Sequence, residues 1–177
     1  LGKLTGSFLG ACGFSVFFGS SFAESLCGGL CGMVIGLVLH LMERFKVNQF
    51  FSTVTSAFLM TLTAWTMNAL NLVTNTDAII IGSLMILVPG LLFTNAMRDI
   101  IFGDTNSGVN RIVQVFLIAA ALALGTAAAW GVTAQIWPHQ EPAAPIVYNG
   151  TTQCVVCCLA CLGFAILFNV HDLGLPL

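Results

Sequence analysis

The chain has 177 residues, of which 58% are hydrophobic and only 7% carry a charged side chain. Soluble domains have roughly 25% charged residues, so this composition, with a mean hydropathy of +0.98, excludes a protein whose whole surface faces water. A net charge of −2 without a basic patch also excludes nucleic-acid binding. We therefore expect an all-α polytopic membrane protein whose surroundings are the lipid bilayer.

The apolar segments predict six transmembrane helices, because a helix needs about 20 apolar residues to cross a bilayer. They cover residues 4–20, 22–42, 50–70, 78–97, 112–133 and 151–170. The first segment lacks the basic region and the small-residue cleavage site of a signal peptide. Because apolar helices lie directly at both ends, we expect the sequence to be part of a longer polypeptide.

The basic residues predict the orientation in an inner (plasma) membrane. With six spans and a cytoplasmic N-terminus, all five lie on the cytoplasmic side, as the positive-inside rule requires: Lys3, Arg44, Lys46, Arg98 and Arg111. The outer side then holds the proline-rich stretch 137–148, with His139 and Glu141. Trp130, Trp137 and Tyr148 are expected near the outer boundary, where aromatic rings gather.

Small residues at three- or four-residue spacing occur in the first two helices and predict close helix packing, because helices in lipid approach through such residues. They are Gly2, Gly6, Gly10 and Gly13 in the first, and Cys27, Gly28, Cys31, Gly32 and Gly36 in the second. Packing within the chain is the main interpretation, and a homo-oligomer interface is the alternative.

Four cysteines fall on one face of the sixth helix at positions i, i+3, i+4 and i+7, namely Cys154, Cys157, Cys158 and Cys161. Four ligands on one straight helix cannot surround a tetrahedral ion. We therefore interpret these thiols as compact apolar packing groups, and expect neither a metal nor a cofactor.

The third helix carries five hydroxyls within an arc of about 100°: Ser52, Thr55, Ser56, Thr63 and Thr66. This arc is expected to face other helices or a water-filled path. Ordinary packing is the alternative, because hydroxyls can bond to carbonyls of their own helix.

Pro89 and Gly90 lie near the middle of the fourth predicted span. Proline removes an amide donor and disturbs the preceding turn, so the helix should kink or break there. A freed carbonyl near Met85 or Ile86 must then face protein or water. Secondary transporters place substrates and coupling ions at such breaks, and Thr94 and Asn95 follow within two turns.

The loop after this helix mixes charges of both signs, with Arg98, Asp99, Asp104 and Arg111. It can act as a cytoplasmic gate in which an arginine pairs with an aspartate. A solvated connector with ordinary surface charges is the alternative.

Residues 9–18 and 159–168 share four identities at a constant offset of 150. Five helices separate the two copies, and an odd number reverses the direction of the second copy, as in the inverted repeats of transporters. We expect residues 1–150 to form a first transmembrane half and residues 151–177 to begin a second.

The block 81–111, with its Pro-Gly helix and acidic loop, and the phrase G-F-A-I-L-F-N-V at 163–170 resemble the threonine/serine exporter family. The resemblance implies proton-coupled efflux of small polar metabolites, either hydroxy amino acids or dicarboxylates such as succinate. It also implies a partner in the form of a second transporter half, on the same chain or on another subunit.

We expect alternating access around the break, with the substrate-binding residues Ser83, Pro89, Gly90, Thr94, Asn95, Thr63 and Thr66. The gate and coupling residues are expected to be Arg98, Asp99, Asp104 and Arg111, and one of the two aspartates would carry the proton. A non-transporting scaffold subunit is the alternative function. An enzyme is not expected, because His40, the one histidine inside a predicted span, has only Glu43 nearby.

Overall fold

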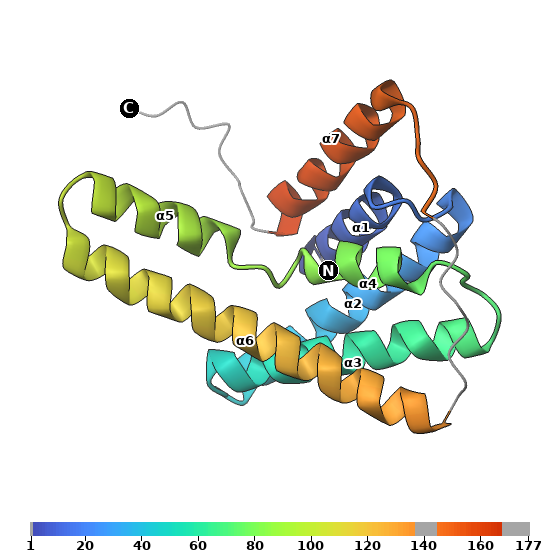
Figure 1. Ribbon diagram of the computed structural model, residues 1–177, viewed down its shortest axis with the longest axis horizontal. Coiled ribbons are helices and arrows are strands. Elements are labelled where there is room, and N and C mark those ends of the chain that lie inside the picture. The colour runs from blue at the N-terminus through green and yellow to red at the C-terminus, as the bar shows by residue number, and fades with distance from the viewer. Residues whose placement is uncertain (1, 137–144, 168–177) are drawn as a thin grey trace.

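The computed structural model of the chain describes residues 2–136 and 145–167, and this part is built from helices without a strand (Figure 1). The helices are α1 (Gly2–Phe17), α2 (Phe22–Arg44), α3 (Gln49–Ala69), α4 (Thr76–Leu84), α5 (Gly90–Ile101), α6 (Thr105–Ile136) and α7 (Gly150–Leu167). Helices α2, α3, α6 and α7 are long and apolar enough to cross a membrane, and α1 is a shorter apolar helix. The all-α class is therefore confirmed. The expectations for Trp137, His139 and Glu141 lie outside the described residues.

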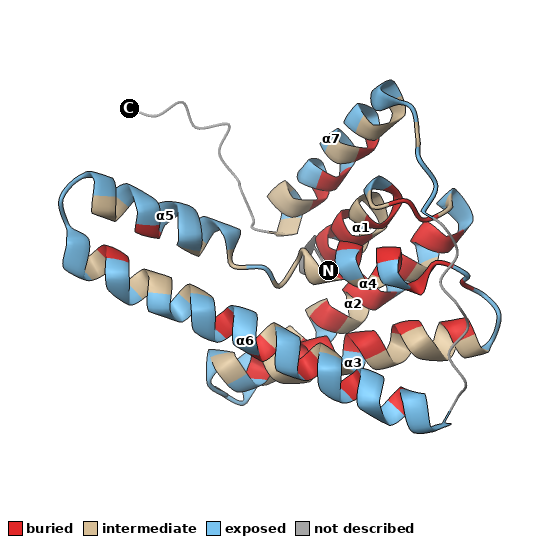
Figure 2. Cartoon of the chain, viewed as in Figure 1, coloured by how far each residue is buried: buried red, intermediate tan, exposed pale blue. Residues whose placement is uncertain are grey.

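The core lies between α2, α3 and α4, where Cys31, Ile35, Met60, Val73 and Ile79 are almost fully buried. Burial of apolar surface between these helices fixes their mutual positions. Figure 2 shows buried residues concentrated in α1 to α4, whereas α5 is mostly exposed. The bundle therefore has a packed body formed by α1 to α4, with α6 lying along α3.

Glycines permit the closest helix contacts, as the small-residue spacing predicts. A Cβ atom added at Gly32 of α2 would lie 2.5 Å from the Cβ of Ala11 on α1, closer than two carbon atoms can approach. On its other side α1 contacts α7, and added Cβ atoms at Gly10 and Gly13 would meet Phe164 and Ala160. The packing interpretation of these glycines is thus confirmed within the chain.

The fourth predicted span is two separate helices. Helix α4 ends at Leu84 and α5 begins at Gly90, directly after Pro89. Helix α4 packs against α1, α2 and α3, whereas the partner of α5 is α6. Of the two expected outcomes, a kink or a break, the structure has the break, and α5 leaves the body that holds α4 (Figure 1).

Helix α6 is 32 residues long and begins at Thr105, ahead of the expected start at residue 112. The preceding turn contains Gly103 with φ +93°, a backbone conformation that favours glycine. The Asp104 carboxylate then accepts a hydrogen bond from the backbone N–H of Ser107 at 3.3 Å. This is the N-cap interaction that starts a helix, so the expected loop is shorter than the sequence pattern suggested.

Candidate functional site

A cavity of about 310 Å³ lies where α4 and α5 separate. Its walls are residues 86–92 of the break, Leu39 of α2, Gln49 and Thr53 of α3, and Gln114 and Ile118 of α6. Most of this lining is apolar, and the polar side chains are two glutamines and a threonine. A concave, mainly apolar site with a few polar groups is the usual form of a small-molecule site.

At the break, turns of the local backbone satisfy only some of the backbone hydrogen-bonding groups. The N–H groups of Leu87 and Val88 donate to the Leu84 carbonyl at 2.8 and 3.2 Å, and the Gly90 N–H donates to the Val88 carbonyl at 2.8 Å. Helix α5 begins in the cavity wall, so its first-turn amides and the positive end of its dipole lie at the cavity. Such a helix start favours negatively charged groups.

Two of the predicted substrate-binding residues, Pro89 and Gly90, line this cavity. Thr94 and Asn95 are both exposed on α5 and do not belong to the lining. The Thr94 hydroxyl donates to the Gly90 carbonyl at 3.0 Å. Asn95 therefore does not line this cavity, because α5 turns away from α3, and its contact with a substrate stays a prediction.

The other three predicted substrate-binding residues lie outside the cavity lining, and their hydroxyls donate to backbone carbonyls. The buried Ser83 hydroxyl donates to the Gly28 carbonyl at 3.3 Å and joins α4 to α2. The hydroxyls of Thr63 and Thr66 donate to the Met60 and Thr63 carbonyls of their own helix, at 2.6 and 2.8 Å. The packing interpretation of these two α3 hydroxyls therefore fits the structure better than a polar path.

The predicted gate residues lie together on the hairpin formed by α5 and α6. An Arg111 guanidinium nitrogen lies 3.0 Å from an Asp99 carboxylate oxygen, which joins the two helices. The Arg98 guanidinium lies over the Phe102 ring at 5.8 Å, and Asp104 caps α6. The expected arginine–aspartate pair is present, but it does not border the cavity at the break.

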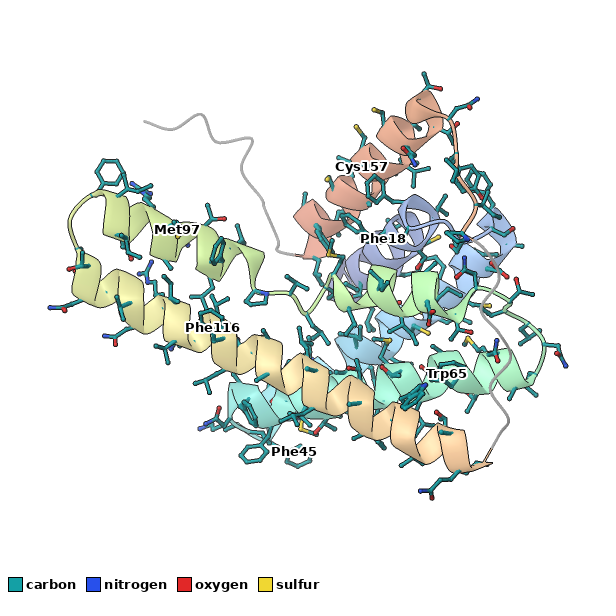
Figure 3. All side chains as sticks on the ribbon, in the orientation of Figure 1. Phe18, Phe45, Trp65, Met97, Phe116 and Cys157 are labelled. Atoms are coloured by element: carbon teal, nitrogen blue, oxygen red, sulfur yellow. The ribbon has the colours of Figure 1, made fainter. Side chains whose placement is uncertain are left out.

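Apolar side chains cover much of the outer surface of this hairpin. Met97 on α5 and Phe116 on α6, labelled in Figure 3, are 39% and 70% exposed. In water such a surface would be unfavourable. It is the surface expected of helices that lie against lipid.

A second cavity, of about 220 Å³, adjoins the first. Leu39 and Ile86 line both cavities, so these two side chains form the wall between them. The second cavity also contains His40 and Glu43, one turn apart on α2. The second cavity therefore places the side chains of His40 and Glu43 next to the cavity at the break.

The glutamines of the first cavity were missed in the sequence. A signal was present, because Gln49 and Gln114 are polar residues at the start of strongly apolar segments. Each lies near the expected end of a span, where polar residues are common and do not by themselves indicate a site. Within the described ranges there is no group of three His, Cys, Asp or Glu side chains that could hold a metal ion.

These features define the class of the molecule: an all-helical polytopic membrane protein with an interrupted helix beside a small cavity. Residues 1–133 match the family model described as "Putative threonine/serine exporter". This match covers the cavity and most of the chain, and the chain belongs to that family of transporters. No curated protein and no solved structure matches the chain.

Proposed function

We propose that the protein is a secondary transporter that exports small polar metabolites across the inner membrane, driven by the proton gradient. The substrates we propose are threonine- and serine-type amino acids or dicarboxylates such as succinate. The observation that carries the proposal is the cavity of about 310 Å³ at the break between α4 and α5. Its volume lies at the lower end of the range for ligand pockets, as small metabolites require.

The lining suits a carboxylate with a polar substituent. The free first-turn amides of α5, including those of Leu91 and Leu92, would bind the carboxylate, as helix starts bind anions. The side chains of Gln49 and Gln114 would accept and donate hydrogen bonds to a hydroxyl, an amine or a second carboxylate. The apolar remainder of the wall would exclude water from the bound substrate.

Alternating access would proceed by movement of α5 relative to α4. The linker at residues 85–89 joins two helices with different packing partners, so the two can separate without disrupting either contact. Thr94 and Asn95, which lie one turn beyond the cavity, would contact the substrate after this movement. The Asp99–Arg111 pair would hold α5 and α6 together as they move.

For the coupling proton we propose His40 with Glu43 in place of Asp99 or Asp104. His40 and Glu43 line the cavity that shares Leu39 and Ile86 with the cavity at the break, whereas Asp99 and Asp104 line neither cavity. A histidine side chain can accept a proton on a ring nitrogen. Protonation there would change the charge beside the substrate cavity.

The proposal is tested by efflux of labelled threonine, serine and succinate from vesicles that contain the native protein at matched abundance. Replacing Gln114 with Leu should lower efflux at least tenfold, because one or two hydrogen bonds to a polar substrate are lost. Gln135→Leu is the matched control, since Gln135 is exposed on the same helix outside the cavity. Normal efflux by Gln114→Leu would remove the cavity from the transport path.

A wild-type protein that exports none of the three substrates would contradict the proposed substrates. If such a protein were still required for the assembly of a larger membrane complex, the scaffold function would replace transport. Gln49→Leu provides an independent variant of the same cavity on another helix, so a folding defect in one variant does not decide the result.

A further inference from the structure

Three connections between helices meet at one end of the bundle (Figure 1). They are the turn between α1 and α2 at residues 18–21, the connection between α3 and α4 at residues 70–75, and the segment before α7 at residues 145–149. The Gly19 carbonyl joins all three, because it accepts hydrogen bonds from the Ile146 N–H at 2.9 Å and from the Asn75 side-chain amide at 3.3 Å. We call this group of contacts the clasp.

The segment before α7 lies closely on the turn between α1 and α2. Gly19 has φ +99°, a backbone conformation that favours glycine, and an added Cβ there would lie 2.8 Å from the Pro145 Cβ. The Tyr148 hydroxyl donates to the Ser20 carbonyl at 3.0 Å, and the Tyr148 ring packs against Phe22 with 5.3 Å between the ring centroids. Tyr148 therefore fastens the segment to the start of α2 by a hydrogen bond and by an aromatic contact.

The clasp and the two cavities lie at opposite ends of the bundle. Helix α2 runs between them, with Phe22 in the clasp and with Leu39 and His40 in the cavity walls. At 1.5 Å per residue, Phe22 and Leu39 are about 26 Å apart along the helix. Helix α7 likewise begins beside the clasp at Gly150 and ends at Leu167, which lines the second cavity. A substrate that crosses the membrane from the cavities therefore leaves the bundle at the end that the clasp holds.

Two hydroxyl groups at the clasp are buried and have no hydrogen-bond partner among the residues that the structure describes. They belong to Ser20 in the turn and to Thr76 at the first position of α4, which are 0% and 2% exposed. A buried polar group without a partner is unfavourable, and this cost disappears when water or a polar ligand reaches the group. The two hydroxyls thus favour a state in which the clasp is open.

Opening of the clasp does not require the helices to separate. Its contacts are formed by connections, whereas the closest contacts of α1 with α2 and with α7 lie along the helices, at glycines such as Gly32 and Gly13. Gates in other proteins commonly move in this way, with a few residues at the ends of elements changing conformation. Release of Tyr148 and of the two hydrogen bonds to Gly19 would open this end while the helices stay packed.

We propose that the clasp is the second gate of the transport cycle, which opens to release the substrate at the end of the bundle opposite the cavities. This inference rests on the proposed transport function. In the structure the gate is closed. When Tyr148 leaves Ser20 and Phe22, water and the substrate reach the hydroxyls of Ser20 and Thr76. Tyr148 is a positioning residue in this mechanism, because it holds the segment before α7 in place.

The first test closes the gate covalently, in a protein without native cysteines. Phe22→Cys and Tyr148→Cys are joined by a short bifunctional thiosulfonate reagent, and efflux is measured before and after the reaction. We expect the crosslink to lower efflux about tenfold, because a gate that cannot open limits the cycle, and we expect reduction of the crosslink to restore efflux. Phe14→Cys with Phe164→Cys is the matched control, since these rings lie 5.0 Å apart between α1 and α7 outside the clasp. The control crosslink should leave efflux unchanged.

The same experiment separates failure of the gate from failure of the proposed function. Normal efflux after the Phe22–Tyr148 crosslink has formed would overturn the gate and leave the transport function in place. A wild-type protein that exports none of threonine, serine and succinate would overturn the transport function, and the gate with it.

A second measurement covers the case in which the cysteine pair does not fold. Ser20→Cys is buried behind the closed gate and should react with an impermeant maleimide only when the gate opens. Tyr148→Phe keeps the ring but loses the hydroxyl, so it should raise the labelling rate about threefold, because loss of one hydrogen bond shifts the equilibrium towards the open state. Leu72→Cys, exposed on the connection between α3 and α4, is the control and should be labelled equally fast with and without Tyr148→Phe.

The exported substrate provides a readout that a purely structural contact would not change. Whichever of threonine, serine and succinate is exported should raise the labelling rate of Ser20→Cys in the presence of the native Tyr148, because the cycle opens the gate. A labelling rate that responds neither to Tyr148→Phe nor to this substrate would overturn the proposal.

Discussion

The Glu24 carboxylate of α2 accepts two hydrogen bonds from Thr74, one from the backbone N–H at 2.8 Å and one from the hydroxyl at 2.6 Å. Its other oxygen accepts from the Ser21 N–H at 3.1 Å, which completes the capping box at the start of α2. One side chain therefore starts α2 and fixes the connection between α3 and α4. The adjacent Asn75 amide donates to the Gly19 carbonyl at 3.3 Å and joins the same connection to the turn before α2.

We expect Thr74→Val to lower the free energy of unfolding by about 1.5–3 kcal/mol, the contribution of a hydrogen bond to a charged group. Thr74→Ser keeps the hydroxyl and should restore most of this loss. The measurement is equilibrium unfolding in detergent with added denaturant. Valine and serine variants of equal stability would show that the short hydroxyl contact contributes little.

Gly82→Ala should destabilise the protein, because the added Cβ would lie 2.6 Å from the Ser15 Cα and force α4 away from α1. Overpacking of this kind costs about 1–3 kcal/mol. Gly131→Ala is the control, since nothing lies within 4 Å of an added Cβ there. Alanine has the higher helix propensity, so the control should be neutral or stabilising in a thermal unfolding assay.

Asp99→Asn should change the free energy of unfolding by less than about 1 kcal/mol, because partly exposed ion pairs contribute little. If the pair holds α5 on α6 during transport, the same variant should slow efflux. The double variant Asp99→Arg with Arg111→Asp should recover it, since opposite charges again face each other. If the double variant is present at normal abundance but its efflux stays slow, the two charges act separately.

Single cysteines in a background without native cysteines test the predicted topology. Position 46, between α2 and α3, should be labelled by an impermeant maleimide from the cytoplasmic side. Position 147, which precedes α7 and is 88% exposed, should be labelled from the opposite side. Labelling of both positions from one side would contradict the orientation that the basic residues predict.

The sequence contained enough information for the helical class, the glycine contacts and the break at Pro89. Each depends on a local rule: apolar length, small-residue spacing or the missing proline amide. The start of α6 could also have been found, because Asp104 followed by Thr105 is a typical helix-start pattern. The pair between Asp99 and Arg111 follows from a short loop with opposite charges.

The position of α5 could not be predicted in this way. An apolar segment of this length can complete a span after a kink or fold back on its neighbour, and the choice depends on which helix covers it. Here Gly108 of α6 provides the close approach, since an added Cβ would meet the Ala96 carbonyl at 3.0 Å. That contact joins residues on two different helices, so no local pattern within α5 predicts it.

The length of α6 has a consequence for where the α5–α6 hairpin lies. Its 32 residues extend about 48 Å at 1.5 Å per residue, whereas a bilayer core is about 30 Å thick. The apolar part of α6, residues 112–133, is long enough to cross that core, so the polar first turns at residues 105–111 extend beyond it. Gly108 in these turns packs on α5, so the Asp99–Arg111 ion pair lies at the edge of the hydrocarbon core and not within it.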